Sequence, residues 1–397
     1  MTLHPQAKRL AGVVGLLVGS LLVAGCDSLP GAGRMTTLSP QHANTDVTLR
    51  QAHLFTSTSG WVLTADRVLT TTDGGTSWDD VTPPSGVDTS LETAFFLNPS
   101  IGWAVRLRRE NIGGYAAPLD LFTTSDGGRH WNSLGMAATT PIDTPGPVYL
   151  TFVDPMRGWL VVDQGSHAGF MYYKGFRTTD GGRTWKKLSY PQSAPVHFLN
   201  QMDGFSVGGG DGPKAGAYGT HDGGQTWARL GLPQAGGPAW SSRMDLPVFS
   251  DDRTGVLAGE VFDPSGSGTS VVFYTTSDAG RTWRLAATIA NPHPGNSVQA
   301  GGVVTEKVWL AAFYEAGPVQ HTTYTLLKAT NDGGRTWESM PAPLSGYLTN
   351  QINFAGSTGW AIMVDSGCRG FKTDCFTNYG LFQTKDSGSH WVDVPLP

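Results

Sequence analysis

Short apolar runs that alternate with glycine-rich polar turns dominate the chain. Two representative runs, Leu119–Thr123 and Val271–Thr275, combine branched and aromatic side chains, and each is followed by a turn rich in Asp, Gly, Ser and Thr. Runs of this composition bounded by such turns are typical of β-strands. No helical periodicity of useful length occurs after residue 25. The pattern therefore predicts an all-β protein.

One polar turn, with the pattern Thr-x-Asp-x-Gly-x-x-Trp, occurs seven times, from Thr71–Trp78 to Thr384–Trp391. Successive tryptophans are 53 to 56 residues apart, except for a spacing of 42 between Trp185 and Trp227. A repeat of this length predicts a propeller or a solenoid. The aspartate can accept hydrogen bonds from later backbone N–H groups, and the glycines allow positive φ. We therefore interpret the seven aspartates as structural: Asp73, Asp126, Asp180, Asp222, Asp278, Asp332 and Asp386.

A second repeated element, Gly-Trp or a close variant, precedes each of these turns. Gly60-Trp61 and Gly158-Trp159 are well-formed copies, and an apolar run such as Ala94–Leu97 comes before most of them. Each unit is therefore predicted to contain a strand, a Gly-Trp strand, a third strand, the aspartate turn and a last strand. Four antiparallel strands form a propeller blade. Seven units predict a seven-bladed β-propeller over residues 46–397.

The composition agrees with this fold and excludes some functions. Charged residues make up 15% of the chain and glycine supplies 53 of 397 residues, as expected for a turn-rich β protein. The net charge is −5, and it becomes about −7 when the two positive charges of the first 25 residues are left out. A chain without a basic tract is not expected to bind nucleic acid. No zinc-ligand spacing, phosphate-binding loop or Ser-His-Asp signature is found, so we expect no metal and no cofactor.

Residues 1–25 have the features of an export signal. Lys8 and Arg9 precede the apolar stretch Ala11–Ala24, which is too short to span a membrane as a helix. The stretch ends in Val-Ala-Gly-Cys, which matches a bacterial lipobox and predicts lipidation of Cys26. The alternative is an ordinary secretory signal followed by an incidental cysteine.

Lipidation would tether the chain to the outer face of the cytoplasmic membrane or to an outer membrane, because two or more acyl chains anchor a protein stably. Residues 26–45 contain Ser, Pro, Gly, Thr and Asn and are predicted to be a flexible spacer. The other two cysteines, Cys368 and Cys375, flank a short loop near the C-terminus. In an exported protein this pair predicts a disulfide, and a metal site is the weaker alternative.

The repeated turn resembles the Asp box, or BNR repeat, of a large group of β-propellers. In these propellers the box joins the third and fourth strands of a blade, and the functional face is at the opposite end. The resemblance therefore implies that the functional residues follow the second strand of each blade. Acidic residues there could form an acidic rim, or could simply be frequent at strand ends. The candidates for this face, including basic residues of the second blade and two residues of the segment 230–247, are Asp66, Arg106, Arg108, Arg109, Asp163, Asp211, Trp240, Arg243, Glu260, Glu315 and Asp365.

Two of these groups depart from the acidic pattern. Arg106, Arg108 and Arg109 form a local basic spot in the second blade. Trp240 and Arg243 lie in the segment 230–247, which is predicted to be a loop between blades. A tryptophan outside the repeat is a candidate contact for a protein partner or a sugar. It could equally cap the short fourth blade.

The repeats are similar to those of the Ycf48-like photosystem II assembly factors, which are seven-bladed, extracytoplasmic and non-enzymatic. Gly158-Trp159 with Asp180–Trp185 is the best-matching copy, and the similarity covers residues 47–397. It implies a role in protein binding or assembly. Those factors carry an arginine patch, of which this chain has only the short basic spot. The chain lacks the Arg-Ile-Pro motif of sialidases.

A carbohydrate-binding propeller or a glycoside hydrolase is the alternative function. A hydrolase of this kind needs two facing carboxylates. Asp211, Glu260 and Glu315, in consecutive blades, are candidates for them. The sequence favours a non-catalytic protein-binding scaffold over this alternative.

Overall fold

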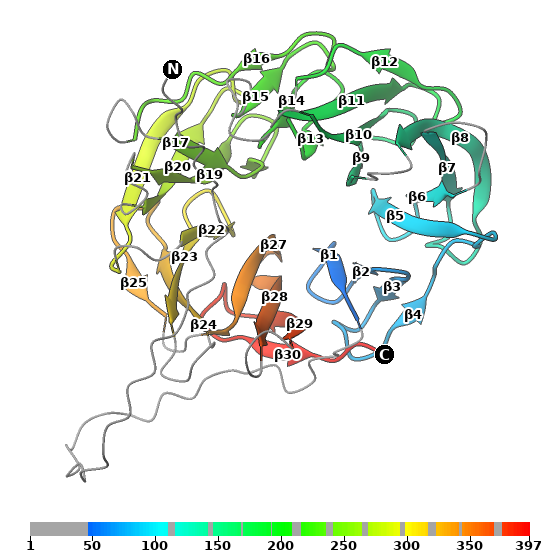
Figure 1. The fold of residues 1–397 in the computed structure, drawn as a ribbon. Helices are drawn as coiled ribbons and strands as arrows, with labels where there is room; N and C mark the ends of the chain where they lie inside the picture. Colours follow the sequence, from blue (N-terminus) through cyan, green and yellow to red (C-terminus); the bar gives the residue numbers. More distant parts are fainter. Residues whose placement is uncertain are drawn as a thin grey trace, which may run out of the picture. The chain divides into compact units, whose positions relative to one another are not determined.

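The computed structural model describes residues 47–109, 116–141, 146–167, 170–191, 193–208, 216–235, 241–263, 269–293, 298–316, 323–340, 344–368 and 375–397. Thirty strands in these ranges form seven antiparallel sheets. Figure 1 shows the sheets arranged as blades in a ring around a central channel. The predicted seven-bladed, all-β propeller is confirmed. Within the described ranges no helix is long and apolar enough to cross a membrane.

In each of the first four blades, four consecutive strands pair in order from the channel outward. Blade 1 contains β1 (Leu49–Leu54), β2 (Gly60–Thr64), β3 (Val68–Thr71) and β4 (Asp79–Asp80). Blade 2 contains β5 (Thr89–Phe96), β6 (Gly102–Arg108), β7 (Ala116–Thr124) and β8 (Asn132–Pro141). Blade 3 contains β9 (Val148–Phe152), β10 (Gly158–His167), β11 (Phe170–Thr178) and β12 (Lys186–Leu188). Blade 4 contains β13 (Val196–Phe198), β14 (Gly204–Ser206), β15 (Tyr218–Thr220) and β16 (Ala228–Arg229).

Two of the last three blades have an interrupted strand. In blade 5 the first strand is split into two pieces that both pair with the second, and in blade 6 the third strand pairs with two short outer pieces. Blade 5 contains β17 (Ser241–Met244), β18 (Val248–Phe249), β19 (Gly255–Phe262), β20 (Thr269–Thr276) and β21 (Arg284–Ala290). Blade 6 contains β22 (Val298–Val303), β23 (Trp309–Ala316), β24 (Thr323–Thr330), β25 (Glu338–Ser339) and β26 (Leu344–Ser345). Blade 7 contains β27 (Tyr347–Ala355), β28 (Thr358–Cys368), β29 (Cys375–Thr384) and β30 (Val392–Val394).

The expectation of a loop over 230–247 is wrong for its last part. Ser241–Met244 form β17, the innermost strand of blade 5, and Arg243 pairs directly with Glu260 of β19. Three of its four residues, Ser241, Ser242 and Arg243, are polar, so the strand shows no alternation of apolar and polar residues. The apolar pattern alone could not reveal such a strand.

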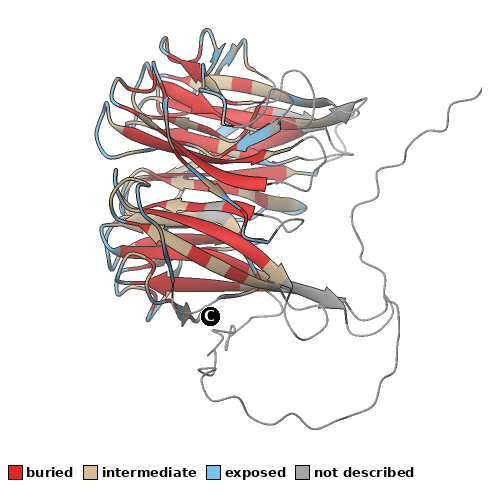
Figure 2. Ribbon diagram, turned by 90° about the vertical axis from the view of Figure 1, so that its left-hand side faces the viewer, coloured by how far each residue is buried: buried red, intermediate tan, exposed pale blue. Residues whose placement is uncertain are grey.

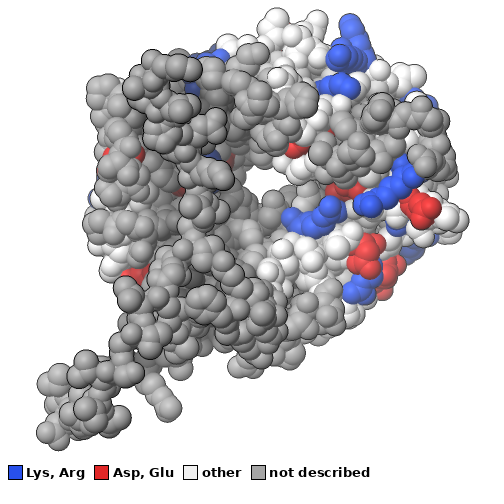
Figure 3. All heavy atoms as spheres, in the orientation of Figure 1, with Lys and Arg blue, Asp and Glu red and all other residues white. Residues whose placement is uncertain are grey.

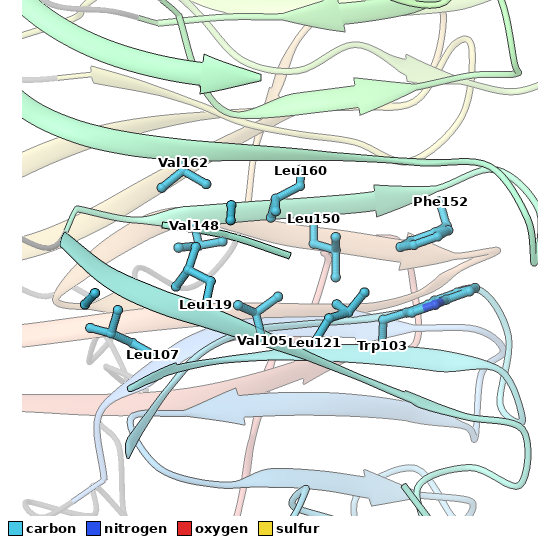
Figure 4. Packing of buried hydrophobic residues seen from close by; sticks show 12 residues of the cluster. Trp103, Val105, Leu107, Leu119, Leu121, Val148, Leu150, Phe152, Leu160 and Val162 are labelled. Carbon is cyan, nitrogen blue, oxygen red and sulfur yellow. The ribbon is translucent and has the colours of Figure 1, made fainter. Parts of the chain in front are cut away.

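The core lies in the seams between neighbouring blades, where each sheet face buries its apolar side chains. In the seam between blades 2 and 3, Trp103 and Leu121 pack against Leu150 and Phe152 (Figure 4). The rings of Trp103 and Phe152 stack at 3.7 Å, and Trp103 is 1% exposed. Complete burial of each such side chain contributes about 1.5–3 kcal/mol. The tryptophan of the Gly-Trp repeat thus packs neighbouring blades together.

In the described part of the chain, blades 1 and 7 each contain only strands that are consecutive in sequence, so they share no strand where the ring closes. Apolar side chains of both blades form the common core. The backbone N–H of Leu54 donates to Asn353 Oδ1 at 2.7 Å, and the indole of Trp78 donates to the carbonyl of Pro395 at 3.0 Å. The guanidinium of Arg67 donates to the carbonyl of Pro397 at 2.7 Å. Packing and side-chain hydrogen bonds therefore hold the two ends of the ring together.

Candidate functional site

The Asp-box turns occupy one end of the blades, between the third and fourth strands. Figure 2 shows exposed turns gathered at that side of the ring, with the buried strands behind them. In blade 3, Asp180 accepts hydrogen bonds from Thr178 Oγ1 at 2.8 Å, from the backbone N–H of Thr184 at 2.9 Å and from its hydroxyl at 2.6 Å. The backbone N–H of Gly182 donates to Thr178 Oγ1 at 2.9 Å. Each Asp box thus closes on itself.

All seven box aspartates have equivalent partners, with His130 and His390 taking the place of the last Thr or Ser in two of the turns. These hydrogen bonds stabilise the charged carboxylate and lower its pKa, to about 2 for Asp126, Asp180 and Asp278. A carboxylate committed to its own turn is not available to a substrate.

A second repeated turn joins the first and second strands at the same end, and the sequence analysis missed it. Asn98, Asp154, Asn200 and Asp251 each accept backbone N–H bonds from residues two and three positions later, at 2.5–2.9 Å. These are Asx turns. A signal was present, because each of these residues stands four positions before the glycine that begins the next strand.

The described cleft on this end lies between blades 4 and 5 and is lined by Asn200, Asp203, Asp252, Arg253, Asp278, Ala279 and Arg281. Asp203 is 7% exposed and already engaged. Its carboxylate forms hydrogen bonds with the imidazole of His221 at 2.6 Å, the amide of Asn200 at 3.0 Å and the guanidinium of Arg281 at 3.4 Å. The contact between Arg281 and Asp203 therefore joins the two sides of the cleft.

The opposite end of the blades carries the candidate residues, and their environments differ from one blade to the next. In blade 2 Arg106 is buried and donates from Nη2 to the carbonyl of Pro83 at 2.8 Å. Burial lowers the pKa of this guanidinium. Arg108 lies 2.6 Å from Asp120 in an ion pair, and Arg109 is exposed. The predicted basic spot thus splits into a structural arginine, a paired arginine and an exposed one.

Figure 3 views this end of the ring and shows basic and acidic side chains together beside the channel, over the part formed by β5–β7. Arg50 of β1 also contributes there. Its Nη1 donates to the carbonyl of Leu91 at 2.6 Å, and its Nη2 lies 4.0 Å from Glu92. The surface near blades 1 and 2 is a mixture of charges and not an acidic rim.

Two of the predicted rim carboxylates are buried, so the expectation that they lie on a surface rim is wrong. Asp163 of β10 and Glu260 of β19 are each 2% exposed. Both residues lie within the second strand of their blade and not beyond its end. Burial raises the pKa of both carboxyl groups, to about 7 for Glu260.

Glu260 and Arg243, which the sequence analysis treated separately, form one pair. Arg243 Nη2 lies 2.6 Å from Glu260 Oε2 across the β17–β19 ladder. Burial of Glu260 is the larger influence on its pKa, and the arginine opposes it. Tyr314 of β23 lies close by, with its hydroxyl within hydrogen-bond distance of Gln299 and of the carbonyl of Leu348. A polar cluster therefore crosses the inner ends of blades 5, 6 and 7.

Asp163 has a different neighbourhood. Its Oδ1 accepts the backbone N–H of Gly165 at 2.6 Å. Burial raises the pKa values of Tyr149 and Tyr173, and the charge of the nearby Asp163 carboxylate adds to the effect. The same type of position thus holds a carboxyl group in two distinct ways.

The other candidates do not converge on these two groups. Asp66 accepts the hydroxyl of Thr64 at 2.9 Å, Glu315 pairs with His293, and Asp365 is half-buried with a raised pKa. Asp211 and Trp240 lie outside the described residues. Cys26 and the rest of the predicted leader also lie outside them. The backbone register places Cys368 opposite Cys375 at the end of the β28–β29 pair.

The innermost strands bring two histidines toward the channel, which sequence reasoning also missed. His53 of β1 and His197 of β13 occupy equivalent register positions, opposite Trp61 and Phe205. Enclosure by the ring lowers both pKa values, and His197 contributes to lowering that of His53 to about 4. Within the described part of the chain no group of three or more His, Cys, Asp or Glu could hold a metal ion.

Comparisons with known proteins add structural likeness at low identity. No protein-family model and no curated protein sequence matches the chain. A solved structure of YCF48 bound to a D1 peptide is 16% identical and covers 87% of this chain and 99% of its own, with a TM-score of 0.49. YCF48 from Cyanidioschyzon merolae is 16% identical and covers 84% and 98%, with a TM-score of 0.48.

An α-L-arabinofuranosidase from Fusarium graminearum in complex with an iminosugar inhibitor is 10% identical to this chain. It covers 86% of this chain and 95% of its own, with a TM-score of 0.37. At these identities the likeness concerns the fold. The strand pairing described above establishes that fold independently.

Proposed function

We propose that this chain is an exported, lipid-anchored propeller that binds a protein partner on the end of its blades opposite the Asp boxes. The chain acts in this proposal as a docking or assembly scaffold and performs no chemistry on the partner. The leader with its lipobox at Cys26 supports the anchor. The resemblance of the repeats to those of extracytoplasmic assembly factors is in line with this role.

The observation that carries the proposal is the difference between the two ends of the blades. At the Asp-box end the same hydrogen-bonded turn recurs in every blade and satisfies its own polar groups. At the other end each blade presents different groups, among them exposed Arg109, exposed Arg243 and the half-exposed ring of Tyr347. Arginine and tyrosine are enriched at the energetic centres of protein interfaces.

The carboxylates favour binding over glycoside hydrolysis. Glu260 is paired with Arg243, and Glu315 is paired with His293. A hydrolase needs an acid and a second carboxylate that both reach the substrate. Among the residues that the structure describes, Glu260 and Asp163 are too deeply buried for that contact. The geometry therefore supports a surface that recognises a partner.

Cross-linking on native membranes tests this proposal. Cells that express the full-length chain are cross-linked, the anchored protein is purified, and co-purified proteins are identified by mass spectrometry. We expect one stoichiometric partner. Arg109→Glu on the proposed face, and Trp240→Ala at the contact predicted from the sequence, should each reduce its recovery several-fold.

Lys385→Glu is the matched control, because Lys385 is an exposed cation of an Asp-box turn at the other end. It should leave the recovery unchanged. An equal loss of partner recovery with Lys385→Glu would indicate that the partner contacts the Asp-box end, which contradicts the proposal. Recovery of no partner would reject the scaffold, and hydrolysis assays with polysaccharides would then test the alternative.

A further inference from the structure

The Arg243–Glu260 pair joins a surface group to an interior one. The side chain of Arg243 is 59% exposed, whereas that of Glu260 is 3% exposed, and the two are direct cross-strand partners. Arg243 lies on β17, the innermost strand of its blade, next to the channel. An arginine in this position has a guanidinium that solvent and a bound partner can both reach.

Glu260 depends on this arginine alone for a donated hydrogen bond among the described residues. Arg243 Nη2 approaches Glu260 Oε2 at 2.6 Å. The hydroxyl of nearby Tyr314 is not a donor to it, because it is committed to Gln299 and to the carbonyl of Leu348. A buried carboxylate with one donor is poorly compensated for the loss of water. The protonated carboxyl group is correspondingly easy to form.

The other charged and titratable groups around the pair are few. Tyr314 lies on β23. Asp245, which follows β17, and Tyr347 of β27 act on it electrostatically, as do Arg243 and Glu260. None of them is a second cation that could hold Glu260 ionised. Burial accordingly raises the pKa of Glu260 to about 7 in spite of the arginine.

The strand that carries Arg243 is also weakly tied to the blade. β17 has four residues, and the segment Asp245–Pro247 separates it from β18. Among the strands that the structure describes, both pieces pair with β19 alone. Loss of the ion pair therefore removes a main side-chain tie between β17 and its neighbour.

We propose that the Arg243–Glu260 pair is a proton-operated latch on the binding face: protonation of Glu260 releases Arg243, which then binds a carboxylate of an acidic partner segment. The proposal rests on the proposed function and names the chemistry and the regulation of the same face. The proton binds to a Glu260 oxygen, and the guanidinium exchanges this buried carboxylate for one supplied by the partner. A planar guanidinium is suited to this exchange because it recognises carboxylates in a bidentate manner.

A fluorescent peptide of ten glutamates, titrated with the purified chain at pH 6 and pH 8 and constant ionic strength, tests the latch. The peptide stays ionised at both values. Because only the released fraction of Arg243 can bind, the wild-type chain should bind about tenfold more tightly at pH 6 than at pH 8. Glu260→Gln should bind at pH 8 as tightly as the wild type binds at pH 6. Arg243→Gln should bind weakly at both values.

Arg109→Gln is the matched control, since it removes an exposed arginine of the same face that is not paired with Glu260. It should keep the tenfold pH dependence. Persistence of the dependence in Arg243→Gln, or in Glu260→Gln, would overturn the latch. A complete absence of peptide binding would also overturn it, while the proposed scaffold function would still be decided by the cross-linking experiment.

A ligand-free measurement keeps the test independent of any probe. The side-chain carboxyl carbon of Glu260 can be followed by NMR through a pH titration, with the Glu260→Gln spectrum giving the assignment. A midpoint near 7 supports the latch. A midpoint near 4.5, the ordinary value for glutamate, overturns it.

Discussion

The two ends of the blades treat carboxylates in opposite ways. At the Asp-box end, Asp180 is surrounded by donors from its own turn, and its pKa falls to about 2. At the other end, Glu260 is withdrawn from water with one donor, and its pKa rises to about 7. Hydrogen bonds stabilise the charged form of the first, whereas burial destabilises the charged form of the second. The repeated end is built for stability at neutral pH, and the variable end contains a group that is poised to change its charge.

The largest effect should come from breaking the packing at the Asp-box end. Gly128, the second glycine of its box, has φ = 90°, and a Cβ there would lie 2.7 Å from Val81 Cβ of the preceding blade. Gly128→Ala should therefore destabilise the chain by about 3 kcal/mol, from the overpacked contact together with the left-handed backbone. Chemical denaturation measures this change.

Gly333→Ala separates the two causes. Gly333 has φ = 75°, but a Cβ there would meet nothing within 4 Å. Only the backbone cost of about 1 kcal/mol should remain. Equal losses in the two variants would show that the second glycine does not act as a contact between blades.

Glu260→Gln should have the next largest effect on stability. Unlike Gly128→Ala, it should stabilise the chain at high pH. The pKa of Glu260 is raised from 4.5 to about 7 in the folded chain, so folding favours the protonated form. The stability that this group contributes is fully present below about pH 4.5 and is lost as the pH rises through 7. At pH 8 the variant should therefore be more stable than the wild type by roughly 2–3 kcal/mol.

Unfolding in denaturant at pH 5 and pH 8 checks this prediction, since the advantage of Glu260→Gln should nearly vanish at pH 5. Asp163→Asn sharpens the comparison. Its carboxylate receives the N–H of Gly165, which opposes the effect of burial, so its advantage at pH 8 should be smaller than that of Glu260→Gln. An advantage that is the same at both pH values would mean that neither carboxyl group changes its charge in this range.

Asp180→Asn should destabilise the chain by about 1–2 kcal/mol at pH 7, because an amide NH₂ cannot accept the bond from the Thr184 hydroxyl. The pKa of Asp180 is lowered from 3.8 to about 2 on folding. The stability from this group is therefore present above pH 4 and is lost as the pH falls through 2. The difference between the variant and the wild type should shrink over this range in denaturation curves. A difference that stays constant down to pH 2 would contradict the role of the charge.

The fold could be predicted from sequence because both of its repeated signals are local. An Asp box closes within eight residues, and the Gly-Trp strand follows a short turn in every blade. The pairing of Arg243 with Glu260 could not be predicted in the same way. The two residues are 17 positions apart, and β17 offers no apolar alternation to announce a strand.

Burial was the other quantity that sequence did not reveal. Asp163 and Glu260 stand four residues after Trp159 and Val256, and the more exposed Asp66 and Glu315 stand five and six residues after Trp61 and Trp309. The prediction of a rim treated these spacings as equivalent. Whether such a carboxylate is exposed depends on how far the sheet continues and on the neighbouring blade. Those are tertiary facts, and they decide the chemistry of the site.

The smallest effect should come from relieving strain in a single Asp box. Ala279 and Ser387 occupy the place of the first box glycine in blades 5 and 7, and they adopt φ values of 60° and 58°. An L-residue is disfavoured in this left-handed region by about 1–2 kcal/mol, and glycine removes this cost. Glycine also gives the unfolded chain more conformational freedom, which offsets part of the gain in stability. Ala279→Gly should thus stabilise the chain by about 0.5–1 kcal/mol at every pH, since no titrating group is changed. A gain that appears only at one end of the pH range would tie Ala279 to the charges of the cleft that it lines.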